Sequence, residues 1–264
     1  MAWYDKPTLL ANINKERNYV FIDESGDIKD FSTVIKKINK GENVEPRDSN
    51  FVLTAIYTNA KSLSYMYASL CGFKEKHFGN HCILHTTDIF NKDLTIGGTS
   101  TPKSVFIEEL NNLVDSFRYK VVGTAFNKAR YVKKYRLSDS SKSLDVIRMI
   151  YKREFLKIEK MLVEMNKTAT FVVEESSNPK IDKMILNLFV ELKTKKRIIN
   201  SKSLYFTKKA AACYPVGTEI ADFTSRAIYS FYKNIEFVET AKKVYDLNLA
   251  YCKYLEFFDK EPKK

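Results

Sequence analysis

The stretch "NYVFIDESGDIKDF", residues 18–31, decides the fold of this chain. Its apolar residues Tyr19–Ile22 predict a buried strand, which runs directly into Asp23, Glu24 and Asp27. Like charges repel one another, and burial penalises every ionised carboxylate. Acids placed at the end of a core strand therefore need a compensating partner.

A second strand pattern ends in the same way. At residues 170–177 the chain reads "TFVVEESS", in which an apolar run ends in Glu174 and Glu175. Alternate residues of a strand face opposite sides, so one acid of each pair can point into a shared cleft. If the two strands are neighbours, a divalent cation between these acids reverses the local charge argument. The alternative is that both strand ends are polar and hydrated.

Strand and helix patterns alternate along the chain, which indicates a mixed α/β layer structure in a single domain, 1–264. Strands are predicted near 18–23, 51–59, 119–127, 168–175 and 203–207. Helices are predicted near 61–73, 102–117, 143–165, 179–195, 217–232 and 236–257, the last within a C-terminal helical extension, 236–264. The polar interval 27–50 is interpreted as a long connection, in which Lys36, Lys37 and Lys40 are candidate phosphate contacts.

One late helix carries two acids. In "YPVGTEIADFTSRAIYSFY", residues 214–232, Glu219 and Asp222 lie on the side opposite the expected apolar face. The pattern by itself favours a solvated face whose early acids suit the helix N-terminus. A contribution of Asp222 to a cation site is the other interpretation.

Glu154 is a further candidate, because it falls within the apolar stripe of the helix predicted at 143–165. An unpaired charge on a core face is costly, so Glu154 there needs a partner or a metal ion. In the other interpretation, Phe155 takes over the seam and Glu154 turns to the rim.

All three histidines, His77, His81 and His85, lie in one segment with Cys82 and Asp88. A spacing of four residues suits helix-borne zinc ligands, but no second cluster completes a tetrahedral site. His85 is also a candidate for proton transfer or phosphate contact, with a structural role as the alternative.

The composition narrows the classes of function. Lys and Arg number 44 against 32 Asp and Glu, and the net charge of +12 suits a polyanionic partner such as nucleic acid. The four cysteines show no framework spacing, so free thiols in a reducing compartment are expected. We find no secretory signal and no apolar run of membrane-spanning length, which predicts a cytoplasmic protein without membrane association. The oligomeric state stays open.

Taken in order, "FIDESGD", "VVEE" and "EIADFTSRAIY" resemble the bacterial domain-of-unknown-function family 3800, which is grouped with the ribonuclease H-like fold. The resemblance spans residue 18 to about residue 232. It implies a ribonuclease H-like mixed sheet flanked by helices, with helical insertions and adjacent first and later strands. Glu174 departs from the Asp of many members, and Glu219 from their frequent Gln.

The resemblance implies that Asp23, Glu174 and Asp222 are catalytic metal ligands, with Glu154 as a further ligand and His85 near the active site. Such acids suit Mg²⁺ or Mn²⁺, and a site with two metal ions is expected. The first hypothesis is a divalent-metal-dependent nuclease that hydrolyses DNA or RNA, in a setting of phage defence or mobile elements. The second is a catalytically inactive ribonuclease H-like module that binds nucleic acid or a protein.

Overall fold

The computed structural model describes residues 17–26, 31–78, 83–86, 103–137, 143–176, 178–208, 215–232 and 254–257. Its strands form one sheet in the order β5-β4-β1-β2-β3-β6. These strands are β1 (Asn18–Ser25), β2 (Asn50–Asn59), β3 (Lys120–Asn127), β4 (Ala169–Glu174), β5 (Ser201–Thr207) and β6 (Tyr254–Phe257). The helices are α1 (Phe31–Asn39), α2 (Pro46–Ser49), α3 (Ala60–Phe78), α5 (Lys103–Asp115), α6 (Lys128–Tyr135), α7 (Ser143–Glu164), α8 (Pro179–Thr194) and α9 (Val216–Tyr232).

The sheet is mixed. Strand β2 lies between β1 and β3 and runs antiparallel to both. The other three pairs are parallel: β4 with β1, β5 with β4, and β6 with β3. The carboxyl ends of β1, β3, β4 and β5 therefore lie at the same end of the strands. We call this end of the sheet the acidic edge. This arrangement confirms the predicted mixed α/β sheet flanked by helices, with the first and later strands adjacent.

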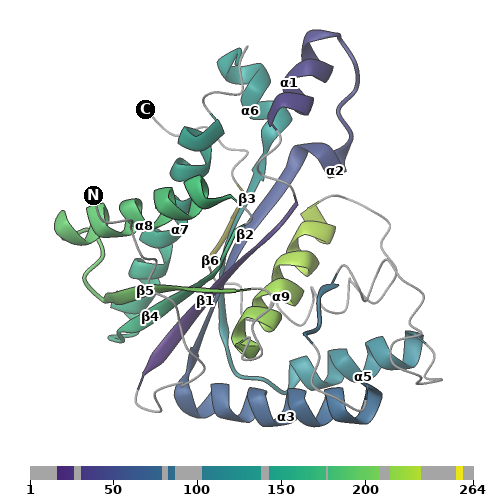
Figure 1. The fold of residues 1–264 in the computed structure, drawn as a ribbon, viewed down its shortest axis with the longest axis vertical. Helices are drawn as coiled ribbons and strands as arrows, with labels where there is room; N and C mark the ends of the chain where they lie inside the picture. The colour runs from purple at the N-terminus through teal and green to yellow at the C-terminus, as the bar shows by residue number, and fades with distance from the viewer. Residues whose placement is uncertain are drawn as a thin grey trace.

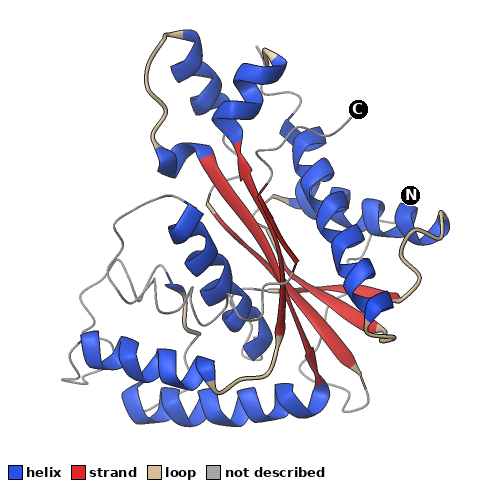
Figure 2. Cartoon of the chain, turned by 180° about the vertical axis from the view of Figure 1, so that it is seen from behind, coloured by secondary structure: helices blue, strands red, loops and turns tan. Residues whose placement is uncertain are grey.

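Helices cover both faces of the sheet (Figures 1 and 2). On one face, Val20 and Ile22 of β1 join a core with residues of α7 and α8. On the other face, Tyr19 and Phe21 join a core with residues of α3, α5 and α9. Burial on both faces explains why β1 reads as a continuous apolar run rather than an alternating one.

Two glycines bring backbones close together at β1. A Cβ on Gly217 would lie 2.2 Å from the ring of Phe21, so only glycine lets the start of α9 pack directly on β1. Gly26, immediately after β1, has φ +89°, and a Cβ there would lie 2.5 Å from the Asn50 carbonyl oxygen. Left-handed backbone and lack of space both favour glycine at position 26.

The five predicted strands and the helices predicted between 61 and 232 are confirmed, with small shifts of their ends. Three helices were missed. The supposed connection 27–50 contains α1 and α2, and α6 follows β3 directly. Lys37 was a candidate phosphate contact, but its Nζ lies 2.7 Å from Asp48 Oδ2.

The C-terminal prediction differs in part from the structure. Most of the helix predicted at 236–257 lies outside the described residues, but Tyr254–Phe257 form strand β6 instead. Cys71 is a free thiol, and the other three cysteines lie outside the described residues. Within the described ranges, no helix is long and apolar enough to cross a membrane.

Candidate functional site at the acidic edge

Asp23 and Glu174 end neighbouring parallel strands. Ile22 of β1 is in register with Val173 of β4, so the next residues, Asp23 and Glu174, lie side by side at the acidic edge. Asp23 has the same side-chain parity as Phe21, and Glu174 has that of Val172, and both of these apolar residues belong to the core under α9. Both acids therefore face α9.

Helix α9 contributes the third acid, Asp222, whose side chain is only 13% exposed. Burial raises the pKa of Asp23 well above its ordinary value, and the negative charges of Asp222 and Glu174 raise it further. A backbone hydrogen bond at Glu24 acts in the opposite direction. The structure thus brings Asp23, Glu174 and Asp222 together, close enough to repel one another through partly buried surroundings.

A buried hydroxyl lies beside these acids. Thr54 of β2 is directly opposite Asp23 in the antiparallel pair, so the two side chains share a face of the sheet. Thr54 is 0% exposed. Within the described part of the chain, its Oγ1 has no hydrogen-bond partner. A buried hydroxyl of this kind needs a polar partner, which an ion-bound water or a ligand supplies.

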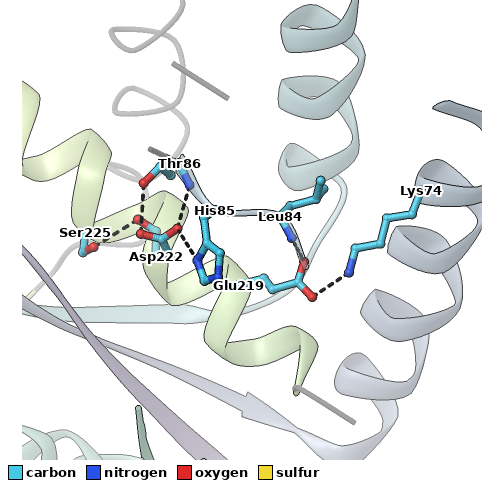
Figure 3. A network of polar contacts seen from close by, with 7 residues as sticks. All are labelled: Lys74, Leu84, His85, Thr86, Glu219, Asp222 and Ser225. Carbon is cyan, nitrogen blue, oxygen red and sulfur yellow. Dashed lines mark hydrogen bonds and ion pairs between the residues drawn. The ribbon is translucent and has the colours of Figure 1, made fainter. Parts of the chain in front are cut away.

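Asp222 also holds the segment 83–86 (Figure 3). The Thr86 backbone N–H donates to Asp222 Oδ2 at 2.8 Å, and Thr86 Oγ1 donates to Oδ1 at 3.0 Å. His85 Nδ1 lies 3.8 Å from Asp222 Oδ2. The structure therefore brings His85 to the acidic group, as the sequence interpretation expects.

Glu219, one turn before Asp222, is neutralised by a lysine. Lys74 Nζ of α3 lies 2.6 Å from Glu219 Oε1, and the two side chains are 8% and 2% exposed. The Leu84 backbone N–H donates to Glu219 Oε2 at 3.3 Å (Figure 3). Burial raises the pKa of Glu219, and Lys74 is the largest opposing influence. A solvated acidic face on α9 is therefore wrong: Glu219 and Asp222 clamp the segment 83–86 against the helix.

The donor set suits a divalent cation in chemical type. Carboxylate and hydroxyl oxygens are the ligands that Mg²⁺ and Mn²⁺ prefer. As the side chains lie, however, no group of three or more His, Cys, Asp or Glu among the described residues is arranged to hold a metal ion. Each oxygen of Asp222 accepts one hydrogen bond from Thr86, which leaves lone pairs on both oxygens for a cation.

Glu154 does not join this group. It is 0% exposed, and Thr124 Oγ1 donates to its Oε2 at 2.6 Å. Thr124 has the side-chain parity of Val122, which packs in the core under α7, so Glu154 lies on the face of the sheet opposite Asp222. The expectation that Glu154 shares a metal ion with Asp23 is corrected. Phe155 is also buried, so neither of the two residues turns to the rim.

The structure does not support His77 as a zinc ligand. Its Nε2 lies 2.7 Å from Glu109 Oε2 of α5, and its ring packs against Phe73 and Phe106. His77 is thus a structural residue that joins α3 to α5. His81, Cys82 and Asp88 lie outside the described residues.

Sequence reasoning missed three residues of the site: Lys74, Thr86 and Thr54. Lys74 has a detectable signal, because it follows Leu70 at helical spacing on the buried face of α3, where a charge needs a partner. Thr86 and Thr54 have no such signal. Their role depends on which strand and helix pack beside them.

No protein-family profile matches the chain, and no curated protein matches it. Among solved structures, Bst-RNase HIII in complex with Mn²⁺ matches with TM-score 0.37 and 10% identity over 88% of this chain and 70% of that one. A mutant of Bst-RNase HIII matches with the same score and identity over 90% and 71%. This likeness is too distant to assign a function. The resemblance to domain-of-unknown-function family 3800 rests on the quoted motifs alone.

Proposed function

We propose that the protein is a divalent-metal-dependent nuclease that hydrolyses phosphodiester bonds, with Asp23, Glu174 and Asp222 as its metal ligands. The observation that carries the proposal is the meeting of these three acids, from β1, β4 and α9, at one edge of the sheet. Nothing else in the described part of the chain explains why β1 and β4 end in carboxylates that face the same helix. A bound cation removes the repulsion between them.

Each side chain has a distinct part in this proposal. Asp23 and Glu174 are held by strands and form the fixed side of the site, because their backbones are paired within the sheet. Asp222, which accepts two hydrogen bonds from Thr86, would be the third ligand from the helix side. When bound, Mg²⁺ or Mn²⁺ supplies a nucleophilic water and neutralises the phosphate charge. His85 lies beside Asp222 and is suited to contact phosphate or to protonate the leaving oxygen.

A pair of adjacent variants tests the proposal. Glu174→Gln removes a ligand on the α9 face, whereas Glu175→Gln removes the neighbouring acid just after the end of β4, which we expect to point to the other face if the strand alternation continues. Both lose one charge at the same strand end. We expect Glu174→Gln and Asp23→Asn to abolish Mn²⁺ binding in calorimetry and cleavage of labelled DNA and RNA, and Glu175→Gln to keep both. Equal cleavage by all three variants and the wild type would end the proposal.

The second candidate function is a binding module that does not cut. It is favoured by one observation: both oxygens of Asp222 already accept hydrogen bonds from Thr86. This candidate predicts nucleic-acid binding that is unchanged by EDTA, together with no calorimetric uptake of Mn²⁺. The family resemblance implies a setting in phage defence or a mobile element.

A further inference from the structure

Helix α6 and the residue after it carry a dense positive charge. Residues 128–136 read "KARYVKKYR", with five basic residues and no acid. Lys128 is buried, but Arg130, Lys133, Lys134 and Arg136 are exposed. The last of these ends the helix in a left-handed conformation, with φ 49°. A short helix with this much exposed charge of one sign has a polyanion as its natural partner.

An exposed aromatic ring lies among these charges. Tyr135 is 45% exposed, and its inner side packs on Tyr131, with ring centroids 4.5 Å apart. Tyr131 in turn packs on Phe126 of β3 at 5.3 Å. The Lys134 ammonium lies 5.6 Å from the Tyr135 ring centroid. Tyr135 is thus a supported ring with an adjacent cation, which is the combination that binds an unpaired base and its phosphate.

The topology brings this helix to the acidic edge. Asp23, Thr54 and Gly123 form one row across β1, β2 and β3. Helix α6 starts directly after Asn127, four residues beyond Gly123. At a rise of about 3.3 Å per strand residue, the end of β3 at Asn127 is therefore about 13 Å further along the sheet than the row of Asp23. Val132 of α6 packs in the core on the face of the sheet opposite α9, so a bound strand a few nucleotides long reaches the acids by passing over the carboxyl end of β3.

Helix α1 supports α6 from the side. The two helices pack together, and Lys128 Nζ lies 6.0 Å from the ring centroid of Phe31, the first residue of α1. Figure 1 shows α1 and α6 together at one end of the sheet. Lys36 of this neighbourhood is also exposed and extends the positive surface, whereas Lys40 Nζ lies 3.8 Å from Glu42 Oε1.

We propose that Arg130, Lys133, Lys134, Tyr135 and Arg136, here called the α6 surface, hold single-stranded nucleic acid beside the acidic edge. The basic side chains contact phosphates, and Tyr135 stacks on an unpaired base. This inference rests on the proposed function, and it narrows the substrate to a single strand or to an unpaired end. In a duplex the bases are paired and stacked inside the helix, so Tyr135 has no unpaired base on which to stack.

The experiment compares two triple variants, and each of them replaces three exposed cations by glutamine. The two variants are also matched in backbone, because each includes one residue in the left-handed conformation: Arg136 at φ 49° in one and Lys196 at φ 53° in the other. The test variant is Lys133→Gln/Lys134→Gln/Arg136→Gln, and the control is Lys196→Gln/Arg197→Gln/Lys202→Gln. The control residues lie at the amino end of β5, at the opposite edge of the sheet. Binding of a fluorescein-labelled single strand and its duplex is measured by anisotropy across a salt series, with EDTA present.

We expect the test variant to bind the single strand at least tenfold more weakly, with the slope of log K against log salt reduced by up to about 2, whereas the control keeps most of its affinity. Tyr135→Ala should weaken single-strand binding about tenfold, Tyr135→Phe should not, and neither should alter duplex binding. Equal losses in both triple variants, or equal effects of Tyr135→Ala on single strand and duplex, overturn the inference.

These results are separable from those of the proposed function. If the α6 variants bind as the wild type does while Glu174→Gln abolishes cleavage, only the α6 inference fails. If the α6 variants lose binding while Glu174→Gln still cleaves, only the metal-dependent mechanism fails. If the wild-type protein binds neither the single strand nor the duplex, both the α6 inference and the proposed function are wrong.

Discussion

Replacing Lys74 by methionine tests the pairing of α3 with α9. The substitution leaves the Glu219 carboxylate, 2% exposed, with the Leu84 N–H at 3.3 Å in place of a cation at 2.6 Å. Removing one partner of a buried ion pair costs about 3–5 kcal/mol, because the other charge stays buried without compensation. For a chain of this size that corresponds to a fall of about 10 °C in the melting temperature.

The loss should depend on pH. Burial already raises the pKa of Glu219 above its ordinary value, and Lys74 opposes that rise. Without Lys74 the pKa of Glu219 rises further, so the folded state binds a proton that the unfolded chain has released. The stability gained from that proton is present below the unfolded pKa and is lost as the pH rises through the folded pKa. The deficit of the variant should therefore be larger at about pH 8 than at about pH 5.

Urea unfolding at several pH values measures this effect, and α3 offers a matched control. Lys76 makes a bond of 2.7 Å to Glu109, but its side chain is 62% exposed, so Lys76→Met should change stability little. The double variant Lys74→Met/Glu219→Gln should recover most of the loss, because it no longer buries a lone charge. Equal small losses for the two lysine variants, with no recovery in the double variant, would refute the reasoning.

Three further variants are expected to change stability. Gly217→Ala should lower the free energy of unfolding by about 2 kcal/mol or more, because the added Cβ would lie 2.2 Å from the Phe21 ring. Gly72→Ala on α3 places its Cβ in open space and should stabilise the protein slightly. Thermal melts compare the two variants. Glu159→Gln should cost about 2 kcal/mol in urea unfolding, since the carboxylate accepts backbone bonds from residues 199, 200 and 201, and Glu164→Gln at the exposed end of α7 should cost nothing measurable. Asp23→Asn should raise stability by on the order of 1 kcal/mol while it abolishes cleavage, because it relieves repulsion among the acids, and a destabilised variant would contradict that account.

The sequence predicts most of the sheet because its strands are buried on both faces and read as apolar runs bounded by polar residues. The short helices were missed for a related reason. Helix α1 buries only Phe31, Val34 and Ile35, and α6 buries Val132 amid lysines, so neither has a long apolar stripe. Their stability comes from packing on each other and on the sheet, which local periodicity does not contain.

Some residues of the candidate site can be predicted from the sequence, and others are placed there only by the fold. The ends of β1 and β4 mark Asp23 and Glu174, since a strand that runs into paired acids is conspicuous in the sequence. Glu154 has a different signal, an acid within the apolar stripe of a helix, but the parity of Thr124, which donates to its Oε2, places it on the other face of the sheet. Lys74 compensates Glu219 across 145 residues of chain, and a contact so distant in sequence follows from the fold rather than from any local pattern.

The last described strand has a consequence for handling the protein. Strand β6 supplies the outer neighbour of β3, so residues 254–257 shield backbone N–H and C=O groups that would otherwise face solvent. Cutting the chain before residue 254 leaves an uncovered β-edge beside Val122 and Ala125, which invites a second molecule to pair there and aggregate.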